Sequence, residues 1–138
     1  MNEDQKQIMT YDPLNVTLAV SGRAVTGFAE EGVLTVVYNE DRVTPTVGVK
    51  GDVTYNKNAN NSANLAITLK STSASLAYLR GLASRAQEVR IDISDANEDD
   101  HLHISEERCM ILKVPDVPRG AEQATVTVNI FIPDCNIR

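Results

Sequence analysis

The sequence predicts a mainly β protein, an antiparallel β-sandwich or flattened barrel of about seven to nine strands with one flanking α-helix. Two patterns support this fold class. Apolar residues recur two apart in most segments, as in strands with one buried face, and three or four apart in a single segment, as in a helix. The length of 138 residues fits one domain that can bury its own core. We expect residues 1–10, which lack periodicity, to form a flexible N-terminal arm and residues 11–138 to form a single β-sandwich or barrel domain.

The first strands are short and are divided by turn residues. Apolar residues alternate over 14–20, a Ser-Gly pair turns the chain, and residues 23–28 return to complete a hairpin. The run Glu30-Glu31-Gly32 predicts the next turn. Residues 33–39, which follow it, are rich in the β-branched side chains that strands favour.

Residues 47–70 predict two strands separated by a polar loop. Apolar residues lie two apart over 47–55 and again over 63–69. Gly51 and Asp52 mark a bulge or sharp bend, so residues 47–55 form either one interrupted strand or two short strands. The loop has too little apolar surface to bury, and asparagine tolerates left-handed backbone, so we expect an exposed hairpin tip. Its polar residues are Asn56, Lys57, Asn58, Asn60, Asn61 and Ser62.

The second part of the chain holds the predicted helix and three further strands. Hydroxyl residues at 71–73 provide caps, and leucines and alanines spaced three and four apart predict a helix over 74–86. Two prolines and a glycine form a rigid connector before the last strand. The three strands are predicted over 89–93, 109–114 and 124–132.

The composition argues against several classes of function. The chain has no Trp, 4 Tyr and 2 Phe, so a pocket lined by aromatic side chains is not expected. Lys and Arg form no basic stripe, which argues against tight nucleic-acid binding. The start of the chain does not match a secretory signal, and no apolar stretch approaches the ~20 residues that span a bilayer. Cys109 and Cys135 are expected to be free thiols of a protein made in reducing cytoplasm.

No motif in the sequence predicts catalysis. The nucleophile elbow, the phosphate-binding P-loop and the dinucleotide fingerprint are all absent from the sequence. Asp95, Asn97, Asp99 and Glu106 have the spacing of calcium ligands, but Asp100 stands where that loop requires glycine, and the flanking segments are predicted strands. A solvated acidic turn explains them better. We expect no enzymatic activity, no cofactor and no metal site.

A set of short motifs, taken in order and spacing, resembles the tail tube (inner tube) proteins of contractile-tailed bacteriophages and related prophage elements. The resemblance covers most of residues 11–138, and each motif alone is ordinary turn or strand punctuation. The motifs are Tyr11-Asp12-Pro13, Gly27-Phe28, the run from Val47-Gly48 to Gly51-Asp52-Val53, and Leu65 to Leu69 followed by Ser71-Thr72-Ser73.

The resemblance implies a structural virion protein of a myovirus tail. Such proteins form hexameric rings whose inner sheets join edge to edge into one β-barrel, and the rings stack into a hollow tube that conducts DNA during ejection without binding it specifically. The implied partners are further copies of the chain, the tail sheath protein, and the baseplate and tail terminator proteins. The implied location is the virion tail, assembled in the bacterial host cytoplasm. The alternatives are a tube of a phage-tail-like bacteriocin or type VI secretion apparatus, and a stand-alone ligand-binding β-sandwich.

Two sets of residues are candidates for sites in such a tube. The polar loop of residues 56–62 is the candidate subunit or ring contact. The formal net charge of −6 lies in residues 92–107, which hold 7 acidic residues and no Lys or Arg. Outside that segment, acidic residues on turns are candidates to face the channel and repel DNA, with the outer wall as the alternative location. These candidates are Glu30, Glu31, Glu40, Asp41 and Asp52.

Overall fold

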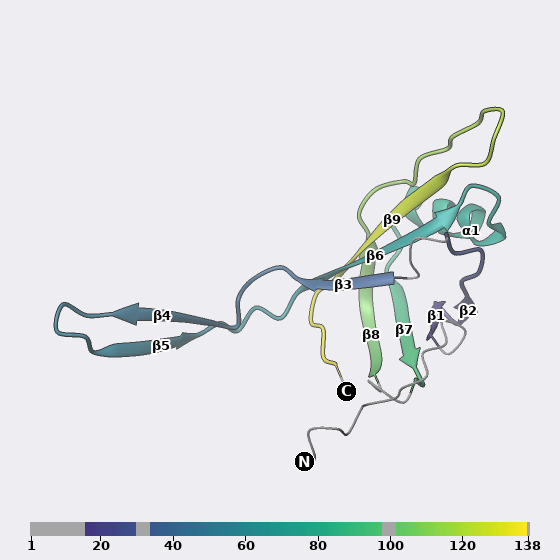
Figure 1. Cartoon of the computed structure of the whole chain (residues 1–138). Coiled ribbons are helices and arrows are strands. Elements are labelled where there is room, and N and C mark those ends of the chain that lie inside the picture. The colour runs from purple at the N-terminus through teal and green to yellow at the C-terminus, as the bar shows by residue number, and fades with distance from the viewer. Residues whose placement is uncertain (1–15, 30–33, 98–101, 138) are drawn as a thin grey trace, which may run out of the picture.

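The computed structural model describes residues 16–29, 34–97 and 102–137, and this described part holds nine strands and one helix (Figure 1). The strands pair antiparallel in two sheets without a closed barrel, which confirms the predicted mainly β fold. The elements are β1 (Val16–Val20), β2 (Arg23–Ala24), β3 (Leu34–Tyr38), β4 (Val43–Val47), β5 (Val53–Lys57), β6 (Ala63–Lys70), α1 (Ala74–Ser84), β7 (Val89–Asp95), β8 (Leu102–Ile111) and β9 (Thr125–Ile132).

Seven strands form one sheet in the order β2-β1-β7-β8-β9-β6-β3. β8 takes part in two halves of this sheet, because its first residues pair with β7 and only Met110 and Ile111 pair with β9. Within the β7–β8 pairing the register shifts between Val89 and Ile91, and on the facing part of β8 Arg108 adopts left-handed backbone with φ 62°. We call the strands β2, β1, β7 and the start of β8 the β1–β7 half. The end of β8 with β9, β6 and β3 is the β6–β9 half.

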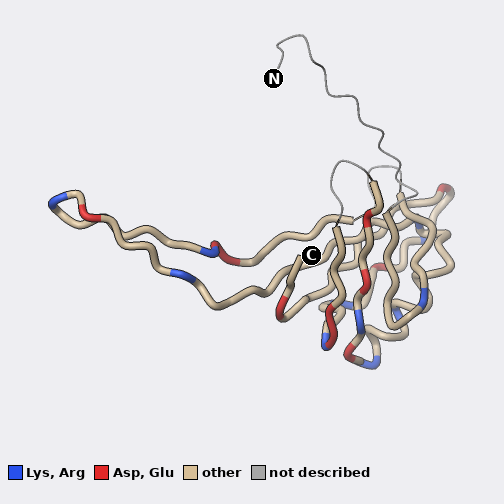
Figure 2. The backbone as a smooth tube through the Cα atoms, turned by 90° about the horizontal axis from the view of Figure 1, so that it is seen from below, with Lys and Arg blue, Asp and Glu red and all other residues tan. Residues whose placement is uncertain are grey.

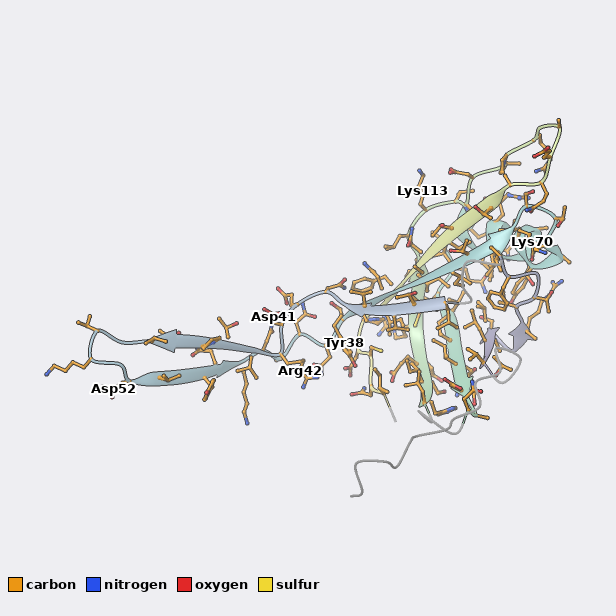
Figure 3. All side chains as sticks on the ribbon, in the orientation of Figure 1. Tyr38, Asp41, Arg42, Asp52, Lys70 and Lys113 are labelled. Atoms are coloured by element: carbon orange, nitrogen blue, oxygen red, sulfur yellow. The ribbon has the colours of Figure 1, made fainter. Side chains whose placement is uncertain are left out.

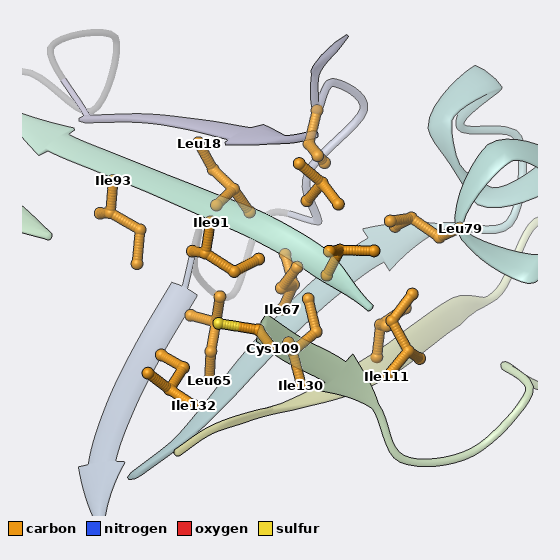
Figure 4. Packing of buried hydrophobic residues seen from close by; sticks show 14 of the residues in the cluster. Leu18, Leu65, Ile67, Leu79, Ile91, Ile93, Cys109, Ile111, Ile130 and Ile132 are labelled. Atoms are coloured by element: carbon orange, nitrogen blue, oxygen red, sulfur yellow. The ribbon is translucent and has the colours of Figure 1, made fainter. Parts of the chain in front are cut away.

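One apolar core lies between the two halves of the sheet (Figure 4). Alternate residues of β6 and β9, such as Leu65 and Ile130, are fully buried and belong to the same cluster as Ile91 of β7. Helix α1 adds three buried leucines, and its N-cap Ser73 accepts a hydrogen bond from the Ser75 backbone N–H. Such a cap supports a short helix whose stability comes mainly from packing. The core leucines of α1 are Leu76, Leu79 and Leu82.

The remaining two strands, β4 and β5, form a hairpin that projects away from the sheet (Figure 1). We call residues 43–57 the arm. All residues of both strands are exposed. The arm ends in a turn in which the Gly51 N–H donates to the Gly48 carbonyl at 3.0 Å, and Gly51 has a φ of 89° that glycine tolerates.

The prediction of a hairpin tip at Asn56–Ser62 is therefore wrong. Asn56 and Lys57 belong to β5, and the remaining residues lead from the base of the arm into β6. Of the two alternatives for residues 47–55, one interrupted strand or two short strands, the structure has the second, because Gly51 lies in the turn between β4 and β5, which pair with each other.

Most other predicted elements are found within a few residues of their expected bounds. The predicted strand over 109–114 is the exception, because β8 begins at Leu102 and ends at Ile111. β8 includes the end of the acidic segment of residues 92–107. A strand can form there because the polar side chains point outward while Ile104 enters the core. The flexible N-terminal segment expected at residues 1–10 lies outside the described residues. The division into that segment and one domain over residues 11–138 stays a prediction.

Candidate functional site

Most residues predicted as a subunit contact lie at the root of the arm, which we define as residues 39–42 and 58–62. Asn58 and Asn60 both donate from their side-chain amides to the Glu40 carboxylate, the first at 3.2 Å. The Asn58 side-chain oxygen also accepts from the Asn60 backbone N–H at 2.9 Å. Ser62 is buried, and its carbonyl accepts from the Asn39 N–H. The asparagines therefore bond to nearby main chain, as their residue type favours, and they join the two chain segments that connect the arm to the sheet. Their role in contacts between subunits stays a prediction.

The arm has one polar face and one face that is apolar except for Lys57 at its base. Residues paired across a hairpin share a face, so Val47 with Val53, and Pro45 with Tyr55, lie on the same side. Val47 is 66% exposed and Tyr55 is 70% exposed. The opposite face carries threonines together with Asn56, whose amide donates to the Thr44 carbonyl and the Thr46 hydroxyl.

Large exposed apolar side chains are concentrated on this arm. Of the ten in the described residues, five lie between Val43 and Tyr55, including Val49 at the tip. An apolar group of this kind, lacking a partner within the chain, is typical of an interaction surface. The sequence prediction missed these residues, although the period-two signal over 47–55 pointed to them.

The acidic candidates are spread over both ends of the arm. Figure 3 places Asp41 at the root and Asp52 at the tip, and Glu40 holds the asparagines of the root. In Figure 2 the charged residues of the arm likewise lie at its tip and root. Glu30 and Glu31 lie outside the described residues. That these acids face a channel stays a prediction.

The outward face of β3, β6 and β9 is nearly free of charge. Alternate residues of β6 and β9 point away from the core, and the strand register places the outward residues in rows such as Thr35, Ala66 and Asn129. We call this surface the threonine face. Its members are Thr35, Val37, Asn64, Ala66, Thr68, Lys70, Thr125, Thr127, Asn129 and Phe131.

The outward face of the β1–β7 half has the opposite character. The Arg90 guanidinium contacts Asp92 at 3.2 Å and Glu107 at 3.0 Å, and it donates to the Ser105 hydroxyl at 2.7 Å. Ser105 in turn donates to Asp92 at 2.7 Å. This hydroxyl, and then the guanidinium, lower the pKa of Asp92 below its usual value. Part of the acidic segment is therefore held in an ion-paired network.

The β6–β9 half has two open sides. β3 is the last strand of the sheet and, within the described residues, pairs only with β6. On the other side, the Leu112 N–H donates to the Asn129 carbonyl at 3.0 Å, after which the chain leaves β9. A groove of about 310 Å³ lies there between residues 113–116 and the first residues of β9. Unpaired strand edges of this kind invite pairing with another chain.

Further features concern chemistry and membranes. Cys109 and Cys135 are buried free thiols, and burial raises the pKa of Cys109 to about 12. The described residues contain no group of three His, Cys, Asp or Glu arranged to hold a metal. Within the part described, α1 is too short to span a bilayer and no other helix does so. Asp95 accepts bonds from Asn97, and Asp99 of the calcium-like spacing lies outside the described residues.

Comparison with known proteins places the chain in a family. The profile of the bacteriophage PhiTE tail tube protein family matches residues 9–105, which is more than half of the chain. The chain belongs to this family. No curated protein sequence matches it. The family assignment makes it a structural component of a phage tail and favours a non-enzymatic role.

Two solved structures share the fold of this tail tube family member over their full length. The tube-terminating cap of the anti-feeding prophage has a TM-score of 0.62 and 11% sequence identity, covering 100% of this chain and 99% of that one. The sheath/tube terminator of the extracellular contractile injection system PVC has a TM-score of 0.60 and 10% identity, covering 98% and 99%. At such low identity the likeness concerns the fold alone.

Proposed function

We propose that this chain polymerises as stacked hexameric rings into the hollow inner tube of a contractile phage tail, through which DNA passes during ejection. The observation that carries the proposal is that the β6–β9 half has an open side at each end, the β3 edge and the groove beside β9. A heterologous contact between two such different sides of identical chains closes into a ring when the rotation allows.

The two sides suit strand addition. The free edge of β3 offers five residues, and the Leu112 N–H to Asn129 bond ends the ladder on the far side of β9. A strand of one copy entering the groove of the next continues the sheet, and main-chain hydrogen bonds then supply affinity at each junction. Repetition around the ring leaves no open strand edge on the β6–β9 half, which removes the hazard of unpaired strands there.

The arm supplies a second contact between copies. Its apolar face has no partner within the described chain, and the proposed occupant is another copy, because a tube is made of one repeated chain. β3 leads through residues 39–42 into the arm, which continues beyond the end of β3 and away from the sheet (Figure 1), where the apolar face can reach another copy. Residues Asn56 to Ser62, at the end of β5 and in the root, remain part of the proposed contact.

The other partners follow from the tube. The ion-paired outward face of the β1–β7 half suits the outside of the tube, toward a sheath protein, with the baseplate and a terminator at the tube ends. The proposed location is the virion tail after assembly in the host cytoplasm. Glu40 and Asp41 at the arm root are proposed to lie at the margin of the channel, where they repel DNA.

Electron microscopy and mass measurement of the concentrated protein, with and without a baseplate-like seed, test the proposal. Rings and tubes are expected, and monomers under every condition would refute it. The junction is tested by mixing a Thr35→Cys chain with a Val114→Cys chain under oxidising conditions. Disulfide-linked pairs are expected from this mixture, whereas a mixture of Thr17→Cys and Val114→Cys serves as the control without linkage.

A tube terminator is the second candidate function. The two solved structures of the same fold are a tube-terminating cap and a sheath/tube terminator, and both match this chain from end to end. A terminator forms a ring that does not stack on itself. Rings that remain single at high protein concentration would therefore favour the terminator over the tube.

A further inference from the structure

We propose that the threonine face forms the wall of the channel and that duplex DNA passes along it because the wall carries almost no charge. This inference rests on the proposed tube. It adds which face of the sheet is turned inward and which chemistry the DNA meets there.

The packing of the two halves determines the orientation. The inner face of β6 and β9 is buried in the core, where residues such as Ile67 and Val128 pack against the β1–β7 half. If the β1–β7 half faced inward, this half of every subunit would occupy space inside the channel. With the threonine face inward, the strands themselves line the channel, and the β1–β7 half with its ion pairs lies outside.

The composition of the threonine face fits this position. The chain as a whole is 23% charged, yet nine of the ten outward residues on this face are uncharged. Lys70 is the exception, and Figure 3 places it at the end of β6 away from the arm. On the β1–β7 half, the outward residues of β7 and β8 include Arg90, Asp92 and Glu107. The threonine face and the outward face of the β1–β7 half therefore differ in the number of charged residues they carry.

An uncharged wall has a direct consequence for DNA. Proteins hold duplex DNA chiefly by neutralising its phosphates with Lys and Arg, which releases counterions. Hydroxyl, amide and methyl groups in rows such as Val37, Asn64 and Phe131 provide no such neutralisation. Within the face itself only Lys70 can pair with a phosphate, and the charges that border it come in both signs, Lys113 with Asp116 and Arg108 with Glu88. The acids at the arm root lie beyond the end of this face, so their repulsion acts at its margin.

Cysteine labelling of assembled tubes tests the orientation. Thr127→Cys places a thiol on the threonine face, and Thr17→Cys is the matched control, an exposed threonine on the outward face of β1. Asn129→Cys repeats the test should Thr127→Cys fail to assemble. The native thiols of Cys109 and Cys135 are buried, so they add little background.

In free subunits both introduced thiols react with a small maleimide and with a polymer-linked maleimide. In tubes we expect the thiol at position 127 to keep its reaction with the small reagent and to lose that with the polymer. The thiol at position 17 should keep both. Equal labelling of position 127 by the polymer in tubes and subunits would overturn the inference. Absence of tubes of the wild-type protein in the microscope would instead refute the proposed function itself.

A second measurement addresses the charge. Tubes are incubated with short duplex DNA at low salt and treated with nuclease, so that only DNA held inside survives. Wild-type and Thr127→Gln tubes should protect no DNA, whereas Thr127→Lys tubes should protect DNA in a salt-sensitive manner. Salt-sensitive protection by wild-type tubes would show a wall that binds DNA and would overturn the inference.

Discussion

Replacing Val47 by serine measures whether a neighbouring copy covers the apolar face of the arm. Val47 is 66% exposed in the single chain, on the face that also carries Val53 and Tyr55. Full burial of a valine side chain stabilises by about 1.5–3 kcal/mol, so covering the exposed part contributes about 1–2 kcal/mol per copy. Since about 1.4 kcal/mol corresponds to a factor of ten, Val47→Ser should raise the critical concentration for assembly about 5- to 30-fold.

The matched control is Thr46→Ser, which changes the neighbouring residue on the opposite, polar face. It keeps the hydroxyl that accepts from Asn56 and should leave the critical concentration unchanged. Sedimentation of assembled material over a concentration series gives the critical concentration of each variant. Neither change should shift thermal unfolding of the monomer, because exposed positions contribute within about 0.5 kcal/mol. Equal critical concentrations for the two variants would contradict the covered face.

Three further predictions concern the folded chain. Gly27→Ala and Gly22→Ala both place alanine at positive φ, which costs about 1–2 kcal/mol. In calorimetry or chemical denaturation, Gly27→Ala should lose about 1–3 kcal/mol more, because its new Cβ lies 2.6 Å from the Cβ of the N-cap serine while Gly22 faces open space. The pKa of Asp92 is lowered by its hydrogen bonds, so its contribution is present above the unfolded pKa of about 4 and is lost as pH falls through the folded value. Asp92→Asn should therefore reduce the loss of unfolding free energy in acid, and an unchanged acid profile would contradict this. Cys109, with a pKa of about 12, should resist a maleimide at neutral pH until denaturant unfolds the chain, as mass spectrometry can show.

Local patterns in the sequence account for much of the fold. The strict alternation in β6 and β9 predicted which residues enter the core, and the leucine spacing with a serine cap predicted α1. Both signals are local, because burial on one face requires a fixed period whatever the element packs against.

Local periodicity could not predict the order of the strands in the sheet or the exposed hairpin that forms the arm. β1 pairs with β7 and β6 pairs with both β3 and β9, and these pairings join residues far apart in the chain. The arm was misread because alternating valines predict burial, while its apolar residues are exposed in the single chain. The alternating pattern of the arm therefore predicts a buried face, but no part of the described single chain covers that face. The threonine face was equally hidden, because it arises only when three distant strands align.

The central place of β9 in the sheet also affects how the chain reaches its folded state. β9 lies between β8 and β6, yet it is translated after every other described strand. Until it arrives, β6 lacks a partner on that side, and the groove in which another copy would pair does not exist. Folding of this half therefore depends on contacts of long sequence separation, which form slowly. The nascent chain accordingly cannot offer a complete assembly surface before β9 has left the ribosome.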